Sequence, residues 1–256
     1  MDDLIDIKYG SDHIYTEFNH CRHVSSARNF IHQHRRKGRQ FRLILQKTLF
    51  LDPKSFDTLV ELINQCTEGI VGLKCFSATR FSEYGSGIFC RVLDECPSIT
   101  QLEVSRCRLK MDTANALITA VASSTILTHF SLKSTKMAPT ALSRLGDVMH
   151  NGSLEYLEVH NEILPYRAVN GLAHALSNDT RLTTLILTEC SLTTTKVDVL
   201  LLTGLLRNTT LTTLSLGFNW FNSYSDSFKQ VLSTNTTLQH LHLPKSCIGN
   251  EQQRSI

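Results

Sequence analysis

Large apolar residues recur along this chain in blocks that begin 27 to 30 residues apart. The last three blocks share the pattern Leu-x-x-Leu-x-Leu and begin at Leu182, Leu211 and Leu238. With isoleucine, phenylalanine, valine or cysteine in place of some leucines, the same frame runs back through earlier starts at Gln40, Ile70, Ile99, Leu127 and Leu154. A period this regular predicts a solenoid in which each repeat packs only against its neighbours.

The first half of each repeat predicts a short β-strand, because apolar and polar residues alternate there. Positions are counted here from the first residue of each repeat, so that +2 is two residues after the start. Position +10 is again apolar, at Leu109, Met137, Leu164, Leu192, Phe221 and Ile248. Position +8 holds a small or polar residue in all eight repeats: Thr48, Ala78, Cys107, Thr135, Glu162, Cys190, Asn219 and Ser246. Glu162 departs most from the asparagine or cysteine of such repeats, and it predicts an irregular loop.

The second half of each repeat predicts a helix. Apolar residues follow helical spacing over residues 56–63, 169–176, 197–205 and 224–232, and each set forms one inward-facing stripe. In the last of these the stripe consists of Tyr224, Phe228, Val231 and Leu232. Asp112 and the Ala-Pro-Thr sequence at 138–140 indicate two further helix starts.

The spacing L-x-x-L-x-L-x-x-N/C-x-L resembles the leucine-rich repeat. A strand and a full helix within 27 to 30 residues are similar to the ribonuclease-inhibitor-like subfamily, which includes sensor arrays of innate immune receptors. The resemblance covers about residues 40 to 250. It implies an α/β solenoid shaped as a horseshoe, with about eight repeats, parallel strands on the concave face and helices on the convex face.

The ends of the chain give the predicted domain organisation. Residues 1–39 are predicted to form an N-terminal helical cap, with Val24, Ala27, Ile31 and His34 on the inward face of a helix over 24–37, and residues 40–256 to form the array. After Ile248 no apolar stripe follows, so the leucines of the last repeat are predicted to be poorly covered. The chain is therefore a fragment of a longer protein, or a partner or a second copy covers this end, the latter implying self-association.

Cysteine usage favours a reducing compartment. The eight cysteines include no C-x-x-C pair, and several occupy core or loop columns where free thiols pack as small apolar groups. The acidic start lacks a signal-peptide pattern, and no stretch is apolar enough to span a membrane. Four N-x-S/T sequons, at Asn151, Asn178, Asn208 and Asn235, all precede strands and fit turn chemistry better than glycosylation. A cytoplasmic protein is predicted.

Catalytic, cofactor and metal chemistry find little support. No nucleophile elbow, phosphate-binding loop or zinc-protease motif occurs. The pair in His20-Cys-Arg-His23 lacks the further ligands of a structural zinc site. The basic run from Arg35 to Arg42 fits the cationic end of a cap helix, with a phosphate-binding or localisation patch as the alternative. No basic stripe continues along the repeats and the net charge is only +3, so nucleic acid is a minor option.

Two candidate binding surfaces follow from the register. Exposed strand side chains in the middle repeats include aromatic and charged residues of the kind that anchor interfaces: Glu103, Arg106, His129, Lys133, Tyr156, Glu158 and His160. The alternative is that they are simply solvated. Phe218 and Trp220 lie outside the core columns, at the strand exit, where they form a contact site or pack on the neighbouring repeat.

These features predict a non-enzymatic recognition module that binds a protein partner through its concave face and needs no cofactor. Short stand-alone arrays also include proteins that bacteria inject into host cells, and the chain fits that pattern, with the host cytoplasm as its location. The alternative is an activator of a small GTPase, as in leucine-rich-repeat GTPase activators. Inhibition of a basic enzyme, as in ribonuclease inhibitor, requires an acidic concave face, whereas the charges here are mixed.

Overall fold

A computed structural model describes residues 13–16, 41–46, 49–50, 53–65, 70–76, 80–81, 87–149, 153–178, 181–221 and 226–244. The chain divides into two compact units, Met1–Lys136 (unit 1) and Met137–Ile256 (unit 2). The predicted cap helix over 24–37, the His20-Cys-Arg-His23 pair and residues 35–40 of the basic run lie outside the described residues. Arg42, at the end of that run, lies in a strand.

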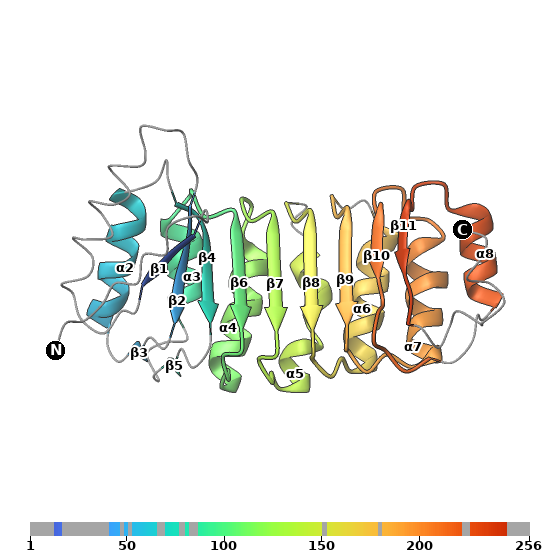
Figure 1. The fold of residues 1–256 in the computed structure, drawn as a ribbon, viewed down its shortest axis with the longest axis horizontal. Coiled ribbons are helices and arrows are strands. Elements are labelled where there is room, and N and C mark those ends of the chain that lie inside the picture. Colours follow the sequence, from blue (N-terminus) through green and yellow to red (C-terminus); the bar gives the residue numbers. More distant parts are fainter. Residues whose placement is uncertain are drawn as a thin grey trace. The chain divides into compact units, whose positions relative to one another are not determined.

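Parallel strands of unit 1 follow the predicted frame. They are β2 (Phe41–Gln46), β4 (Ile70–Phe76), β6 (Gln101–Ser105) and β7 (His129–Lys133), in that order across the sheet (Figure 1). A further strand, β1 (His13–Thr16), pairs in parallel with β2 and was not predicted, because residues 1–39 were expected to form a helical cap. Position +3 of each repeat is in register with the next, from Leu43 to Leu73, Leu102 and Phe130. A separate parallel pair joins β3 (Leu49–Phe50) to β5 (Arg80–Phe81).

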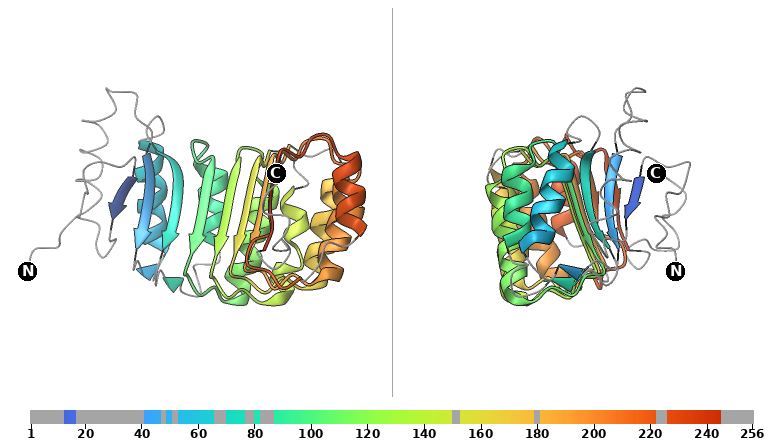
Figure 2. Two further views of the ribbon diagram at one scale, coloured as in Figure 1. Left: turned by 45° about the vertical axis from the view of Figure 1, so that its right-hand side comes forward. Right: turned by 90° about the vertical axis from the view of Figure 1, so that its left-hand side faces the viewer.

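Helices of unit 1 lie on one side of its strands (Figure 2). They are α2 (Pro53–Gln65), α3 (Ile88–Glu95) and α4 (Met111–Ser123), which includes Asp112 in its first turn as predicted. Side chains from both layers meet in the core, where Ile63, Phe89, Leu102, Ile118 and Phe130 are buried. The sequence did not predict α3.

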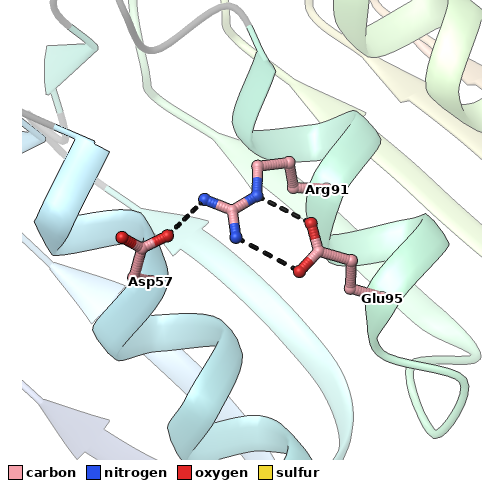
Figure 3. A network of polar contacts seen from close by, with 3 residues as sticks. All are labelled: Asp57, Arg91 and Glu95. Carbon is pink, nitrogen blue, oxygen red and sulfur yellow. Dashed lines mark hydrogen bonds and ion pairs between the residues drawn. The ribbon is translucent and has the colours of Figure 1, made fainter.

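An ion-pair network joins two of these helices on their exposed side (Figure 3). Arg91 of α3 donates from Nε and Nη2 to the two carboxylate oxygens of Glu95, at 2.7 and 3.1 Å, and from Nη1 to Asp57 of α2, at 2.6 Å. The hydrogen bonds from Arg91 lower the pKa of Glu95. Because the network is largely solvated, it ties α2 to α3 at little net gain in stability.

Unit 2 contains the strands β8 (Tyr156–His160), β9 (Thr184–Thr188), β10 (Thr213–Ser215) and β11 (His240–His242), again parallel and in that order. Leu157, Leu185, Leu214 and Leu241 are in register. The segments that begin at 182, 211 and 238 therefore lie side by side, as the repeat predicts. All eight predicted repeat strands are present among the described residues of the two units.

The helical layer of unit 2 is less regular. It comprises α5 (Pro139–Leu142), a 3₁₀ segment η2 (Leu145–Met149), α6 (Tyr166–Ser177), α7 (Thr194–Val199), which continues as the π-helical η3 (Leu200–Leu205), and α8 (Asp226–Thr234). Gly146 and Gly171 let η2 approach α6 closely, since a Cβ on Gly146 would lie 2.6 Å from the Gly171 carbonyl carbon. No described helix has both the length and the apolarity that a membrane span requires.

The side chain at position +8 forms hydrogen bonds with buried backbone groups of the loops, as predicted, and Asn219 forms the largest number of those described. Its Oδ1 accepts hydrogen bonds from the backbone of Cys190 and Leu192 in the preceding repeat, at 2.9 and 3.1 Å. Its Nδ2 donates to the carbonyls of Leu187 and Leu216, at 2.7 and 2.9 Å. This buried amide therefore fixes the loops that follow β9 and β10.

The predicted irregular loop at Glu162 is wrong. Glu162 is 3% exposed, and its Oε2 accepts a hydrogen bond from the Met137 backbone N–H at 3.3 Å. Met137 is position +10 of the preceding repeat, as Leu192 is for Asn219, so Glu162 and Asn219 accept from equivalent N–H groups. The longer side chain of Glu162 thus replaces the asparagine acceptor. The backbone before it is also regular, because position +7 adopts a left-handed φ of 52° to 57° in five repeats: Arg106, Ser134, Asn161, Glu189 and Phe218.

Two further expectations need correction. Leu232 is 51% exposed although Phe228 and Val231 of α8 are buried, so it lies off the inward stripe. Ser105 and Ser131, at strand positions expected to be exposed, are buried, and each short side chain pairs with a longer one on the neighbouring strand of unit 1, Lys133 and Glu103 respectively. The last repeat behaves as predicted: Leu238, Leu241 and Leu243 are partly exposed, whereas Leu211, Leu214 and Leu216 are fully buried.

Two of the sequon asparagines, Asn208 and Asn235, make the expected turn contacts, whereas Asn178 Nδ2 donates to the His174 carbonyl of its own helix at 2.9 Å and Asn151 lies outside the described residues. Asn208 Oδ1 accepts from the backbone of Thr210 and Leu211, and its Nδ2 donates to the Leu176 carbonyl at 2.9 Å. Asn235 repeats this pattern one repeat later, with Nδ2 donating to the Leu205 carbonyl at 2.8 Å. Both amides therefore join the turn of their own repeat to the end of the helix of the preceding repeat.

Candidate functional site

The predicted charged cluster of unit 1 is largely engaged with itself. Glu103 of β6 forms an ion pair with Lys74 of β4, with 2.8 Å between Lys74 Nζ and Glu103 Oε1. Lys133 Nζ of β7 lies 3.9 Å from the same oxygen. All three side chains are about three-quarters buried, with 21 to 28% exposed. His129 Nδ1 lies 2.8 Å from the Thr128 hydroxyl. The exposed Arg106 follows β6 in the left-handed turn.

The predicted cluster of unit 2 follows the exposed face of β8. The Tyr156 hydroxyl donates to Glu158 Oε2 at 2.9 Å, so these two side chains are joined. His160 is half-buried and in register with Thr188 of β9. Directly after His160 the chain enters a groove at the strand ends, and the two predicted surfaces of unit 2 therefore adjoin.

This groove, called here the exit groove, has a volume of about 980 Å³. Its walls come from the residues that follow four consecutive strands, because in-register parallel strands end at the same edge of the sheet. The lining residues are Asn161, Thr188, Glu189, Ser191, Ser215, Gly217, Phe218, Asn219, Trp220, His242, Leu243 and Pro244. Gly217 leaves space between the walls, since a Cβ there would have Thr188 Cγ2 as its nearest neighbour at 3.9 Å.

Phe218 and Trp220 are the most exposed of the large apolar side chains in the described residues, at 74% and 79%. The alternative that they pack on the neighbouring repeat is therefore wrong. Asn219 between them is fixed by its hydrogen bonds, and Phe221 is buried against Phe228 with ring centroids 6.1 Å apart. Both aromatic rings thus stand on a rigid loop.

The backbone at Phe218 is strained. A φ of 55° is unusual for a residue other than glycine, asparagine or aspartate, and a bulky aromatic residue is among the least suited to it. Such a conformation costs on the order of 1–3 kcal/mol. The repeat imposes this turn, but burial of the Phe218 ring does not offset the cost.

The exit groove is lined by one acidic side chain and by no lysine or arginine among its described residues. The acidic side chain is that of Glu189. The nearby Lys196 of α7 donates instead to the carbonyls of Leu164 and Ser191, at 2.7 and 3.1 Å. Below the groove, burial raises the pKa of the Cys190 thiol to about 12, so this thiol is protonated and unreactive at neutral pH.

Sequence reasoning missed Asn161, Glu189 and Ser191, which line the groove next to the predicted aromatics. The available signal was position +7, which places Asn161, Glu189 and Phe218 in the same turn of consecutive repeats. For metal binding, the described residues contain no group of three or more histidine, cysteine, aspartate or glutamate side chains able to hold an ion.

Comparison with known proteins rests on structure. No family model and no curated protein sequence matches the chain. A crystal structure of a complex of TLR13 with ssRNA13 is similar over 91% of this chain and 32% of that chain, with 17% identity and a TM-score of 0.50. A Bacteroides fragilis protein covers 86% of this chain and 70% of its own, with 13% identity and a TM-score of 0.48. An internalin from Listeria monocytogenes covers 80% and 54%, with 15% identity and a TM-score of 0.47.

The chain thus spans about a third of the TLR13 chain that it matches. At this level of identity the similarity concerns the fold alone. Together with the in-register parallel strands and the helices on one side of them, it shows that the fold is a leucine-rich-repeat solenoid.

Proposed function

We propose that this chain is a non-enzymatic recognition module of the ribonuclease-inhibitor-like type, which binds a protein partner through the exposed strand side chains and the exit groove. The observation that carries the proposal is the pair Phe218 and Trp220. Two large aromatic rings stand exposed on a fixed loop, one of them at a backbone cost. Interface hot spots favour such rigid aromatic anchors beside a groove.

The wider contact surface includes the predicted strand residues of each unit. Tyr156, Glu158 and His160 adjoin the exit groove and extend it along β8. On unit 1, Glu103, Arg106, His129 and Lys133 are proposed as weaker contacts, because Glu103 and Lys133 already interact with each other. Such partly exposed ion pairs contribute specificity more than affinity.

A protein partner is favoured over nucleic acid. The TLR13 structure contains ssRNA13, so single-stranded RNA is the natural second ligand to test. A polyanion needs lysine or arginine contacts to its phosphates, and the described lining of the exit groove has none.

The test begins with affinity purification on the tagged full chain and rebinding of the purified partner. Trp220→Ala is expected to raise the Kd roughly 30-fold, as for a hot-spot residue. Gly217→Thr is expected to narrow the groove and weaken binding similarly without unfolding, because a Cβ at this position would have only Thr188 Cγ2 within 4 Å.

Leu232→Ala is the matched control, since Leu232 is also a large exposed apolar residue but does not line the groove. Loss of binding in Leu232→Ala with full binding in Trp220→Ala and Gly217→Thr would contradict the proposal. Small GTPases mixed with the protein are expected to hydrolyse GTP at their basal rate, which separates recognition from GTPase activation.

Two further parts of the proposal concern setting and assembly. A cytoplasmic setting, that of a host cell for an injected effector, is supported by the five described cysteines, all of them free thiols. Self-association through β11 is supported by the partly exposed Leu238, Leu241 and Leu243. Light scattering on wild-type protein and Leu241→Lys tests it: a dimer that the variant converts to monomer is expected, and a wild-type monomer at high concentration contradicts it.

A further inference from the structure

The exit groove carries the features of a cation-binding site. Resting on the proposed function, we infer that the groove selects a partner segment with an arginine side chain, whose guanidinium lies against the Phe218 and Trp220 rings and pairs with the Glu189 carboxylate. The inference deepens the proposed function by naming the chemistry of the partner.

Glu189 and Phe218 are neighbours in the sheet geometry. Both occupy position +7, in consecutive repeats, and the Glu189 N–H donates to the Gly217 carbonyl at 3.2 Å. Paired strands lie about 4.8 Å apart, so the side chains of these two turns share one edge of the groove. Both residues line the groove together with Trp220.

All three side chains are available for a ligand. The carboxylate of Glu189 is exposed and has no hydrogen bond or ion pair with the described residues, unlike that of Glu103. The Phe218 and Trp220 rings are mostly exposed. The nearby Lys196 does not form an ion pair with Glu189, because its Nζ donates to the carbonyls of Leu164 and Ser191.

Arginine suits this set better than lysine. Its planar guanidinium stacks on an aromatic face while its edge donates two parallel hydrogen bonds to a carboxylate. The remaining donors have the hydroxyls of Thr188 and Ser215 as acceptors in the lining of the groove. A phosphate-bearing ligand would instead meet the Glu189 charge with no lysine or arginine in the described lining.

The chain contains a single tryptophan, so Trp220 reports on the site directly. The full chain is titrated with the peptide acetyl-Gly-Gly-Arg-Gly-Gly-amide and with its citrulline counterpart, which has nearly the same shape but no charge. Tryptophan fluorescence and the indole N–H signal in NMR are followed. The arginine peptide is expected to produce a saturable change at about tenfold lower concentration than the citrulline peptide.

Two variants test the assignment. Glu189→Gln is expected to remove most of the difference between the two peptides. Glu155→Gln is the matched control, because Glu155 is a carboxylate of unit 2 that does not line the groove, and it is expected to leave the difference unchanged.

Equal responses to both peptides, or none to either, would overturn the inference, as would a preference for a uridine oligonucleotide over the arginine peptide. These failures are distinguishable from failure of the proposed function. If a purified protein partner still requires Trp220 while arginine and citrulline peptides act alike, recognition through the groove holds and the arginine assignment does not.

Discussion

Glu103 in unit 1 and Glu189 in unit 2 both lie on the strand side of their repeats, yet their surroundings differ. Glu103 interacts with two lysines on the neighbouring strands, whereas Glu189 lacks an ion pair with the described residues and shares a groove with two exposed aromatic rings. A surface whose charges already pair offers a ligand little, because binding must first break those pairs. Exposed charge alone is therefore a poor guide to a site, and unpaired charge beside exposed aromatic rings is a better one.

The loops that follow the strands of the two units also differ in the hydrogen bonds formed by the side chain at position +8. In unit 1, the Cys107 thiol at position +8 donates to the Ser105 carbonyl at 3.3 Å. In unit 2, Asn219 joins two repeats through at least four hydrogen bonds with distances of 2.7 to 3.1 Å. The exit groove thus stands on a loop that one buried side chain joins across two repeats, as preorganised binding requires.

Asn219→Ala is expected to have the largest effect on this difference. It leaves buried N–H groups of Cys190 and Leu192 without acceptors, and it should lower the free energy of unfolding by about 3 kcal/mol. Urea denaturation measures the loss. Cys107→Ala, the equivalent change in unit 1, is expected to cost about 1 kcal/mol, and equal losses would contradict the contrast between the loops.

Alkaline pH is expected to destabilise both units through their buried thiols. Burial raises the pKa of Cys190 to about 12 and that of Cys96 in unit 1 to about 11. The folded state keeps these protons while the unfolded state loses them, so the stability each thiol contributes is complete below about pH 9 and is lost as pH rises towards the folded pKa. The expected slope is about 1.4 kcal/mol per pH unit for each thiol.

The measurement is urea denaturation between pH 9 and 11 on wild-type protein and Cys190→Ala. The variant is expected to have the shallower slope at every pH in this interval, whatever its stability at neutral pH. Identical slopes would mean that Cys190 is more accessible to water than its burial indicates.

Phe218→Asn is expected to stabilise the protein by about 1 kcal/mol, because asparagine tolerates the left-handed turn. The same change should weaken partner binding, since the ring is lost. Thermal or urea unfolding combined with a binding titration tests both. In unit 1, Arg106→Asn makes the same backbone change without removing an aromatic ring. A destabilised Phe218→Asn protein would show that the ring contributes packing.

The smallest expected effect concerns the paired charges. A double-mutant cycle on Lys74→Met and Glu103→Gln should give a coupling of about 0.5 kcal/mol that decreases at high salt. Glu189→Gln should leave stability unchanged at any salt concentration. A coupling near zero in the cycle would show that the ion pair of Glu103 with Lys74 contributes nothing to stability.

The repeat frame, the strands and their register were predictable because each depends on local alternation of apolar residues. From Leu182 onwards the leucines at +3 align as expected. The α3 helix was not predicted, since its stripe of Ile88, Phe89, Val92 and Leu93 spans only six residues. The role of Glu162 depended on side-chain length matching a distance between two repeats, which no local pattern contains.

The candidate site was only half predictable. Phe218 and Trp220 stood out because they fell outside the core columns of their own repeat. Glu189 lies in a different repeat, and its proximity to them follows only once the strands are placed in register. The engagement of Glu103 with Lys74 likewise depends on side-chain conformations that the sequence does not specify.

The uniform backbone at position +7 has a practical consequence for engineering. Arginine, serine, asparagine, glutamate and phenylalanine all occupy it with nearly the same φ, and its neighbours at +8 are buried in every described repeat. Position +7 therefore accepts different side chains without a change of its backbone conformation. A library randomised at Asn161, Glu189 and Phe218 would vary the chemistry of one rim while leaving the buried framework untouched.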